Sequence, residues 1–173
     1  MKALNVEIKA KCADPEKIRA ILKQRNADFK GEDHQIDTYF KVAQGRLKLR
    51  VGNIENALIH YQRGNQHGPK TSQIKLYKTG AGSELAGVLS HALEALTVVD
   101  KLREIYFIEN VKFHIDQVQQ LGSFVEIEAI DQNGERSEAQ LFEQCQYYLE
   151  LFDIHESQLM ADSYSDMIMA LKS

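Results

Sequence analysis

Charged side chains occupy every second position in several short segments of the sequence. In VEIKAK the charged residues are Glu7, Lys9 and Lys11, and apolar residues lie between them. Successive side chains of a β-strand point to opposite faces, so one face of such a strand is ionic and the other is apolar. The same alternation recurs in three further segments, with Arg46, Lys48 and Arg50 in GRLKLR, Lys112, His114 and Asp116 in VKFHID, and Glu126 and Glu128 in FVEIEA.

The signs of these charges are distributed unevenly along the chain. Like charges that neighbour each other on one face repel, yet cations concentrate in the early segments and the carboxylate pair Glu126 and Glu128 falls in the last. Cations bind phosphate oxygens, and paired carboxylates bind Mg²⁺ together with phosphates. The pattern therefore favours a site for a polyanion and a divalent cation, although a strand with its polar face in water has the same period.

The elements that must position these side chains can be read from the same periodicities. A first strand is expected at Leu4–Lys11, and Asp14 and Pro15 begin a helix that ends near Asn26. Further strands are predicted in DHQIDTYFKV, RLKLRVG, ALIHYQR, QIKLYKT, TVVDKLREIYFIEN, VKFHID and GSFVEIEAID. Helices are predicted in SELAGVLSHALEAL, GERSEAQLFEQCQYYLELFDI and YSDMIMALK. Residues 1–173 are therefore expected to form one α+β domain of about eight antiparallel strands with peripheral helices.

Composition narrows the class of protein. The formal net charge of −4 argues against a general nucleic-acid binder, and no apolar run approaches the roughly 20 residues of a membrane span. The N-terminal MKALNVEIKAK lacks the apolar core of a signal peptide, and Cys12 and Cys145 match no metal spacing. We therefore expect a cytoplasmic protein with reduced thiols and no membrane partner, and we leave open whether it forms a homodimer.

Four motifs together resemble a known superfamily over nearly the whole chain. They are VEIKAK, QIDTYF followed by GRLKLR, KLREIYFIENVKFHIDQVQQLGSFVEIEA, and SYSDMI. This order is similar to that of the CYTH superfamily, the triphosphate tunnel metalloenzymes, and most resembles its class IV adenylyl cyclase branch. The resemblance implies a closed antiparallel eight-stranded β-barrel whose charged tunnel binds a nucleoside triphosphate or another triphosphate with Mg²⁺ or Mn²⁺.

The resemblance also implies roles for individual residues. Glu7, Lys11 and Lys112 would be catalytic, and Glu126 and Glu128 would bind the metal. The phosphate chain would be held by Lys9, Arg46, Lys48, Arg50, Arg63, Lys78 and Arg103. Lys75 and Lys101 are further candidates whose strand register the sequence leaves open.

Three other side chains allow more than one interpretation. Tyr39 and Tyr61 share the parity of the charged residues, so they could contact a base or ribose, or simply fill space. His114 could act as a general base, but we favour a neutral wall residue that is hydrogen-bonded to Asp116.

One departure from the family signature bears directly on function. The signature is Glu-x-Glu-x-Lys, and here Lys9 replaces the second acid, which is normally a metal ligand. Two unit charges about 4 Å apart interact by roughly 4 kcal/mol at an effective dielectric constant near 20, so the replacement could strongly weaken a second metal site. Three functions stay open: conversion of ATP into cyclic AMP and pyrophosphate, hydrolysis of inorganic or thiamine triphosphate, and binding of a nucleotide or polyphosphate without turnover.

Overall fold

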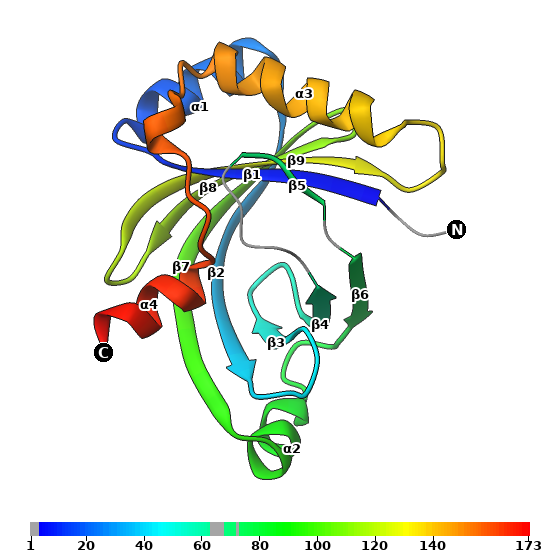
Figure 1. The fold of residues 1–173 in the computed structure, drawn as a ribbon, viewed down its shortest axis with the longest axis vertical. Coiled ribbons are helices and arrows are strands. Elements are labelled where there is room, and N and C mark those ends of the chain that lie inside the picture. Colours follow the sequence, from blue (N-terminus) through cyan, green and yellow to red (C-terminus); the bar gives the residue numbers. More distant parts are fainter. Residues whose placement is uncertain (1–3, 63–67, 72) are drawn as a thin grey trace.

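One curled antiparallel sheet forms the body of the protein. The computed structural model describes residues 4–62, 68–71 and 73–173 (Figure 1). Within them the strands are β1 (Leu4–Lys11), β2 (Asp28–Phe40), β3 (Arg46–Val51), β4 (Ala57–Gln62), β5 (Lys70–Thr71), β6 (Gln73–Lys78), β7 (Ala95–Ile108), β8 (Val111–Val118) and β9 (Gly122–Asp131). The helices are α1 (Pro15–Gln24), α2 (Leu85–Ala92), α3 (Glu138–Leu151) and α4 (Tyr164–Leu171), with a short 3-10 helix at Glu156–Gln158. The strands follow one another across the sheet in the order β5-β1-β9-β8-β7-β2-β3-β4-β6.

The predicted α+β class with antiparallel strands is confirmed, but the predicted closed barrel of eight strands is not observed. The sheet has nine strands in the described part of the chain and curls into a half-barrel. Its two edges are consecutive in sequence: β5 pairs with β1, and β6 pairs with β4. Among the described residues no ladder joins β5 to β6, so pairing between the two edges does not close the sheet.

Local sequence signals determine where the helices begin. The carboxylate of Asp14 accepts a hydrogen bond from the backbone of Lys17 at 3.2 Å, and Pro15 occupies the first helical position of α1. At α4 the hydroxyl of Ser163 caps the helix, and Asp166 bonds back to the Ser163 backbone. The predicted helix start at Asp14 and Pro15 is therefore confirmed, as are the bounds of β1.

The main hydrophobic core lies between the sheet and helices α1 and α3, which cover one face of β1, β8 and β9 (Figure 1). Apolar residues of the alternating strands, such as Val6, Ile8 and Phe113, point into this core and are buried. Because neighbouring side chains in a strand point to opposite faces, the charged residues of the same strands are directed to the concave side of the sheet. The structure therefore shows which way the charged faces of these strands point, which the alternation in the sequence left open.

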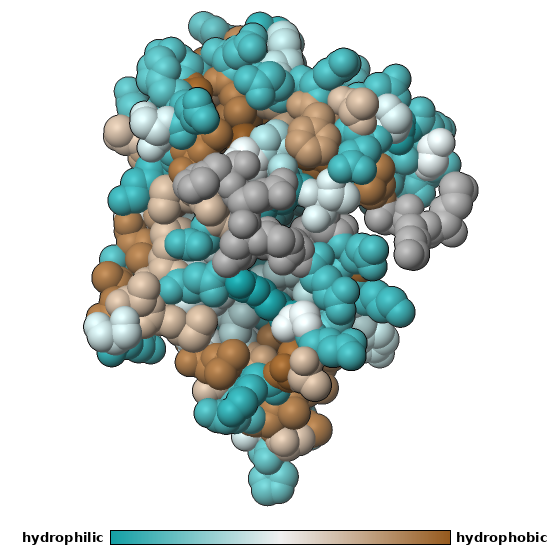
Figure 2. All heavy atoms as spheres, in the orientation of Figure 1, coloured by the Kyte–Doolittle hydropathy of each residue, from teal (hydrophilic) through white to brown (hydrophobic). Residues whose placement is uncertain are grey.

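Apolar residues also remain exposed at one end of the molecule. Figure 2 shows them gathered around α2, where Val88 is 61% exposed, and Leu96 at the start of β7 is 45% exposed. Of the helices in the described ranges, none is long and apolar enough to cross a membrane. Both cysteines, Cys12 and Cys145, are free and buried.

The aromatic contacts of Phe113 predict a large contribution to stability. Its ring is fully buried and packs edge-on against Tyr148 and Phe152, with ring centroids 4.7 and 5.7 Å away. We expect Phe113→Ala to lower the free energy of unfolding by about 3–5 kcal/mol, because it leaves a cavity in the core. In urea denaturation the exposed control Val88→Ala should change this energy by less than about 0.5 kcal/mol; equal effects of the two variants would contradict the assignment of the core.

Candidate functional site

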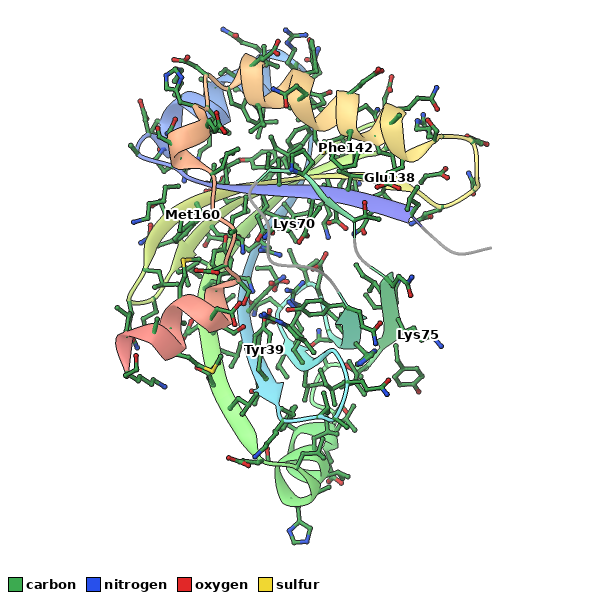
Figure 3. All side chains as sticks on the ribbon, in the orientation of Figure 1. Tyr39, Lys70, Lys75, Glu138, Phe142 and Met160 are labelled. Carbon is green, nitrogen blue, oxygen red and sulfur yellow. The ribbon has the colours of Figure 1, made fainter. Side chains whose placement is uncertain are left out.

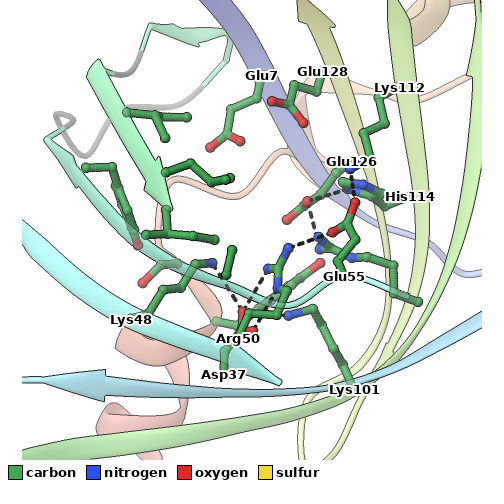
Figure 4. Close-up of a pocket in the computed structure, with 18 of the residues that line it drawn as sticks. Glu7, Asp37, Lys48, Arg50, Glu55, Lys101, Lys112, His114, Glu126 and Glu128 are labelled. Carbon is green, nitrogen blue, oxygen red and sulfur yellow. Dashed lines mark hydrogen bonds and ion pairs between the residues drawn. The ribbon is translucent and has the colours of Figure 1, made fainter. Parts of the chain in front are cut away.

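The concave side of the sheet encloses a cavity of about 450 Å³ (Figure 4). Among the described residues, eight strands, the β3–β4 loop and the start of α4 contribute to its lining. The basic side chains of this described lining are Lys9, Lys48, Arg50, Lys78, Lys101, Arg103 and Lys112. Its acidic side chains are Glu7, Asp37, Glu55, Glu126 and Glu128. The described lining therefore holds more basic than acidic groups, which favours an anionic ligand.

The cavity brings together most residues that the sequence singled out. Those that line it are Glu7, Lys9, Lys48, Arg50, Lys78, Arg103, Lys112, Glu126 and Glu128. Lys11 is exposed and lies outside the lining, and Arg46 is held at its margin by Asp166 at 2.9 Å. Arg63 lies outside the described residues. Lys75 points away from the concave face (Figure 3), whereas Lys101 lines the cavity.

Strand register places the charged side chains of β1, β9 and β8 in rows. In one row Glu7 lies opposite Glu128, which lies opposite Lys112. In the next row Lys9 lies opposite Glu126, which lies opposite His114. Because directly opposed residues are the closest side chains on one face of a sheet, Lys9 is positioned to neutralise Glu126.

Glu126 is surrounded by positive or hydrogen-donating groups. Its carboxylate accepts a hydrogen bond from Arg103 at 2.9 Å and one from Nδ1 of His114 at 3.0 Å, and Nζ of Lys9 is 3.8 Å away. Burial opposes ionisation, but Arg103 and His114 hold the pKa of Glu126 well below its usual value. The predicted hydrogen bond from His114 to Asp116 is wrong. The imidazole instead bonds to Glu126, which lies directly opposite on the neighbouring strand β9.

Asp116 instead orients Arg103. The guanidinium donates to both carboxylate oxygens of Asp116, at 2.7 and 2.6 Å. The hydroxyl of Tyr164, at the start of α4, donates to the same carboxylate at 2.7 Å, and Lys9 lies 4.1 Å above the Tyr164 ring. Tyr164 therefore connects the C-terminal helix to the ionic wall through a hydrogen bond and a cation–π contact.

Asp37 is the centre of a second ionic cluster. Arg50 donates to both of its oxygens, at 2.9 and 2.8 Å, and the ammonium groups of Lys101 and Lys48 lie 2.9 and 3.2 Å from one of them. Burial opposes ionisation of Asp37, but Arg50, Lys101 and Lys48 hold its pKa well below the usual value. Burial lowers the pKa of Lys101 to about 7, although Asp37 opposes this shift. This cluster concentrates three cations on one carboxylate.

Glu55 belongs to the site although no pattern in the sequence singled it out, and it bridges Lys112 of β8 and Arg50 of the Asp37 cluster. It forms ion pairs with Lys112 and, at 3.0 Å, with Arg50. Its position depends on Asp33, which is fully buried and accepts hydrogen bonds from the backbone amides of Ile54 and Glu55 at 2.8 and 2.9 Å. In the sequence Glu55 lies in GNIEN, between the predicted strands RLKLRVG and ALIHYQR, and no pattern there indicates a cavity residue.

Glu7 and Glu128 form a carboxylate pair on the concave face. The two residues are directly opposed on β1 and β9, and both line the cavity (Figure 4). Burial raises the pKa of Glu128, and the charge of Glu7 raises it further. Like charges held together in this way are relieved by a cation. No cluster of three or more candidate metal ligands occurs in the described part of the chain, but Mg²⁺ commonly uses one or two carboxylates and completes its shell with phosphates and water.

The chain resembles known proteins in both sequence and fold. The model of the CYTH domain matches residues 3–164. A conserved protein from Pyrococcus furiosus is 21% identical, with a TM-score of 0.80, 94% of this chain covered and 98% of that one. A candidate adenylate cyclase from Vibrio parahaemolyticus is 17% identical, with a TM-score of 0.78 and coverage of 97% and 99%.

A more distant structural neighbour has a described activity. This candidate adenylyl cyclase from Hippeastrum, for which a dominant triphosphatase activity is described, is 13% identical, with a TM-score of 0.60 and coverage of 98% and 96%. Identities this low establish a common fold and nothing finer. Comparison with curated proteins found no match.

The environment of His114 predicts how stability depends on pH. Burial, helped by Arg103, lowers the pKa of this imidazole from 6.5 to about 4 in the folded state. Between these pH values the unfolded chain binds a proton that the folded chain does not, so stability falls as the pH falls from 6.5 toward 4. His114→Asn preserves a donor to Glu126 but cannot titrate. Wild type should therefore lose up to about 3 kcal/mol more than this variant over that range.

Urea denaturation at several pH values measures this difference. The matched control is His91→Asn on α2, because His91 is exposed. Its pH dependence should follow that of the wild type. If His114→Asn also followed the wild type, the assigned environment of His114 would be incorrect.

Proposed function

The chain belongs to the CYTH domain family, and from this premise we propose that its cavity binds a triphosphate with a divalent cation and converts ATP into cyclic AMP and pyrophosphate. Proteins of this family process triphosphates in a divalent-metal-dependent manner. The observation that carries the proposal is the convergence, among the described residues, of seven basic and five acidic side chains in one cavity. A solvated sheet would spread such charges over its open surface instead.

The phosphates are held by the cations of the two ionic clusters. Lys48 and Arg50 approach from the Asp37 cluster, and Arg103 and Lys112 approach from the wall of β7 and β8. Each of these cations is paired with a carboxylate in the structure. A bound phosphate oxygen therefore either replaces that carboxylate or becomes a second partner of the cation. Charge-assisted hydrogen bonds from guanidinium groups suit phosphate oxygens particularly well.

The divalent cation is assigned to Glu7 and Glu128. The register of β1 and β9 sets these two carboxylates directly opposite each other on the concave face, which supports the assignment, and Glu126 is held by Arg103 at 2.9 Å and lies 3.8 Å from Lys9. The pair expected from the sequence was Glu126 and Glu128. The proposed pair keeps Glu128 and replaces Glu126 with Glu7. A bound Mg²⁺ or Mn²⁺ would offset phosphate charge and polarise the reacting phosphoryl group.

Cyclisation requires the ribose 3′-oxygen to bond to the α-phosphorus while the bond from that phosphorus to the bridging oxygen breaks. The hydroxyl proton passes to solvent water, and negative charge develops on the departing pyrophosphate. Arg103, Lys112 and Lys9 supply fixed positive charge for this leaving group. They also fix the phosphate chain, which reduces the entropy that the reaction must lose.

Two other outcomes have specific support. Hydrolysis of the terminal phosphate, with water as the nucleophile, is supported by the triphosphatase activity described for the Hippeastrum protein of the same fold. Binding without turnover is supported by Lys9, which lies 3.8 Å from Glu126 at the position of a family metal ligand. The products separate the three outcomes.

The first experiment incubates the purified protein with Mg²⁺ or Mn²⁺ and with ATP, thiamine triphosphate or tripolyphosphate in turn. Cyclic AMP together with pyrophosphate supports the proposed reaction, and orthophosphate supports hydrolysis. Binding of a triphosphate in calorimetry without any product supports a protein that has lost turnover. If no triphosphate binds, the proposed function is wrong.

Metal dependence supplies the test of the carboxylate assignment. Glu7→Gln and Glu128→Gln should each raise the Mn²⁺ concentration needed for half-maximal turnover by about tenfold or more, because each removes a charged ligand. Glu150→Gln, an exposed acid on α3, is the matched control and should leave that concentration unchanged. An unaltered Mn²⁺ requirement in both cavity variants would rule out Glu7 and Glu128 as the metal ligands.

A further inference from the structure

The carboxylate of Glu55 lies between two of the cations that the proposed function assigns to phosphate. One of its oxygens accepts a hydrogen bond from the ammonium group of Lys112, and the other accepts one from Arg50 at 3.0 Å (Figure 4). The side-chain amide of Gln35, which is fully buried, donates to that second oxygen at 3.2 Å. Burial opposes ionisation, but Lys112 and Arg50 lower the pKa of Glu55 below its usual value. Two cations and an amide are a donor set that also suits a phosphate group.

The buried carboxylates that pair with the cavity cations are held differently. Asp37 and Asp116 lie within strands β2 and β8, and each is 1% exposed. Each accepts two hydrogen bonds from one guanidinium group, that of Arg50 or Arg103 respectively. Separating either pair would leave a buried charge without its partner, which is strongly unfavourable. We therefore expect these two pairs to persist when a ligand binds.

Glu55 differs from these aspartates in both position and exposure. It lies in the loop between β3 and β4, and its side chain is 27% exposed. It contacts each cation through one oxygen only. A partly exposed carboxylate can return to water when another anion takes its place, so its displacement costs much less free energy than that of a buried one.

The backbone that carries Glu55 is fixed, so the side chain is the part that can move. Asp33 accepts hydrogen bonds from the backbone amides of Ile54 and Glu55. A Cβ atom at Gly52 would lie 2.6 Å from a carboxylate oxygen of Asp33 and 2.7 Å from the backbone oxygen of Glu55. This close approach therefore requires glycine. Rotation about the side-chain bonds of Glu55 would free both cations without rearranging the loop.

We propose that Glu55 is a built-in competitor of the ligand: its carboxylate occupies the place of one phosphate group between Lys112 and Arg50, and a bound triphosphate drives it out. Resting on the proposed function, in which the cavity holds a triphosphate, this assignment makes Glu55 a residue that weakens binding. Each ligand must break the contacts of Glu55 before its phosphates reach the two cations. The effect acts on the phosphate chain alone, so it is independent of the organic part of the ligand.

Calorimetry in the presence of Mg²⁺ tests the competition with two probes, a non-hydrolysable ATP analogue and tripolyphosphate. Glu55→Gln keeps the shape of the side chain but removes its charge, so it should bind both probes about tenfold more tightly than wild type. Glu55→Ala, which also removes the contacts of the side chain, should change both affinities in the same direction. The matched control is Glu94→Gln, an exposed acid that pairs with Lys41 at 3.2 Å outside the cavity lining. Its loss should alter each affinity by less than about twofold.

A double-mutant cycle tests whether the competition is for Lys112. Lys112→Gln removes one of the two cations and should weaken the binding of tripolyphosphate in the wild-type background. In the Glu55→Gln background the same substitution should weaken binding by a factor about threefold larger, because Glu55 no longer neutralises Lys112 there. Equal factors in the two backgrounds would overturn the inference.

The outcomes separate this inference from the function on which it rests. If wild type binds the probes and neither Glu55 variant binds them more tightly, Glu55 does not compete with phosphate although the cavity binds triphosphates. The inference is also overturned if Glu94→Gln tightens binding as much as Glu55→Gln, because the effect is then one of overall charge. If neither wild type nor the Glu55 variants bind any probe, the proposed function fails as well. A gain in affinity cannot result from partial unfolding, so the expected result is distinct from a loss of structure.

Discussion

Charges that point into a curled sheet must neutralise one another, and this requirement governs the cavity. A buried ion without a partner costs far more free energy than a paired one, and removal of one partner leaves the other uncompensated. Asp37 therefore collects three cations, and Glu126 is shared by Arg103, His114 and Lys9. The proposed anionic ligand would meet a lining with more basic than acidic groups in which most of the cations already have carboxylate partners, so its binding would also redistribute those partners.

Much of the scaffold could be predicted because it depends on local rules. The bounds of β1 follow from strict alternation, and the start of α1 follows from the cap Asp14. The alternation also collected Lys48, Arg50 and other cavity residues on one face of their strands. What it could not decide was the direction of that face, which depends on the packing of α1 and α3 against the opposite one.

Features that depend on contacts between distant segments were missed or misjudged. Glu55 enters the site through a loop that Asp33 fixes from another strand, and nothing within GNIEN encodes that contact. His114 bonds to Glu126 instead of Asp116 because the register of β8 and β9 decides its neighbour. The predicted closed barrel depended on such a contact as well. In the described residues β5 and β6 form opposite edges of the sheet, where β5 pairs with β1 and β6 pairs with β4.

The contact between Lys9 and Tyr164 joins segments from opposite ends of the described chain. Tyr164 also completes the support of Arg103 through Asp116, so β1 and α4 both belong to the same wall. Contacts separated by so much chain close a very large loop and lose correspondingly more entropy when they form. Assembly of the cavity is therefore coupled to docking of α4, because loss of that helix removes the hydrogen bond from Tyr164 to Asp116 and the ring beneath Lys9.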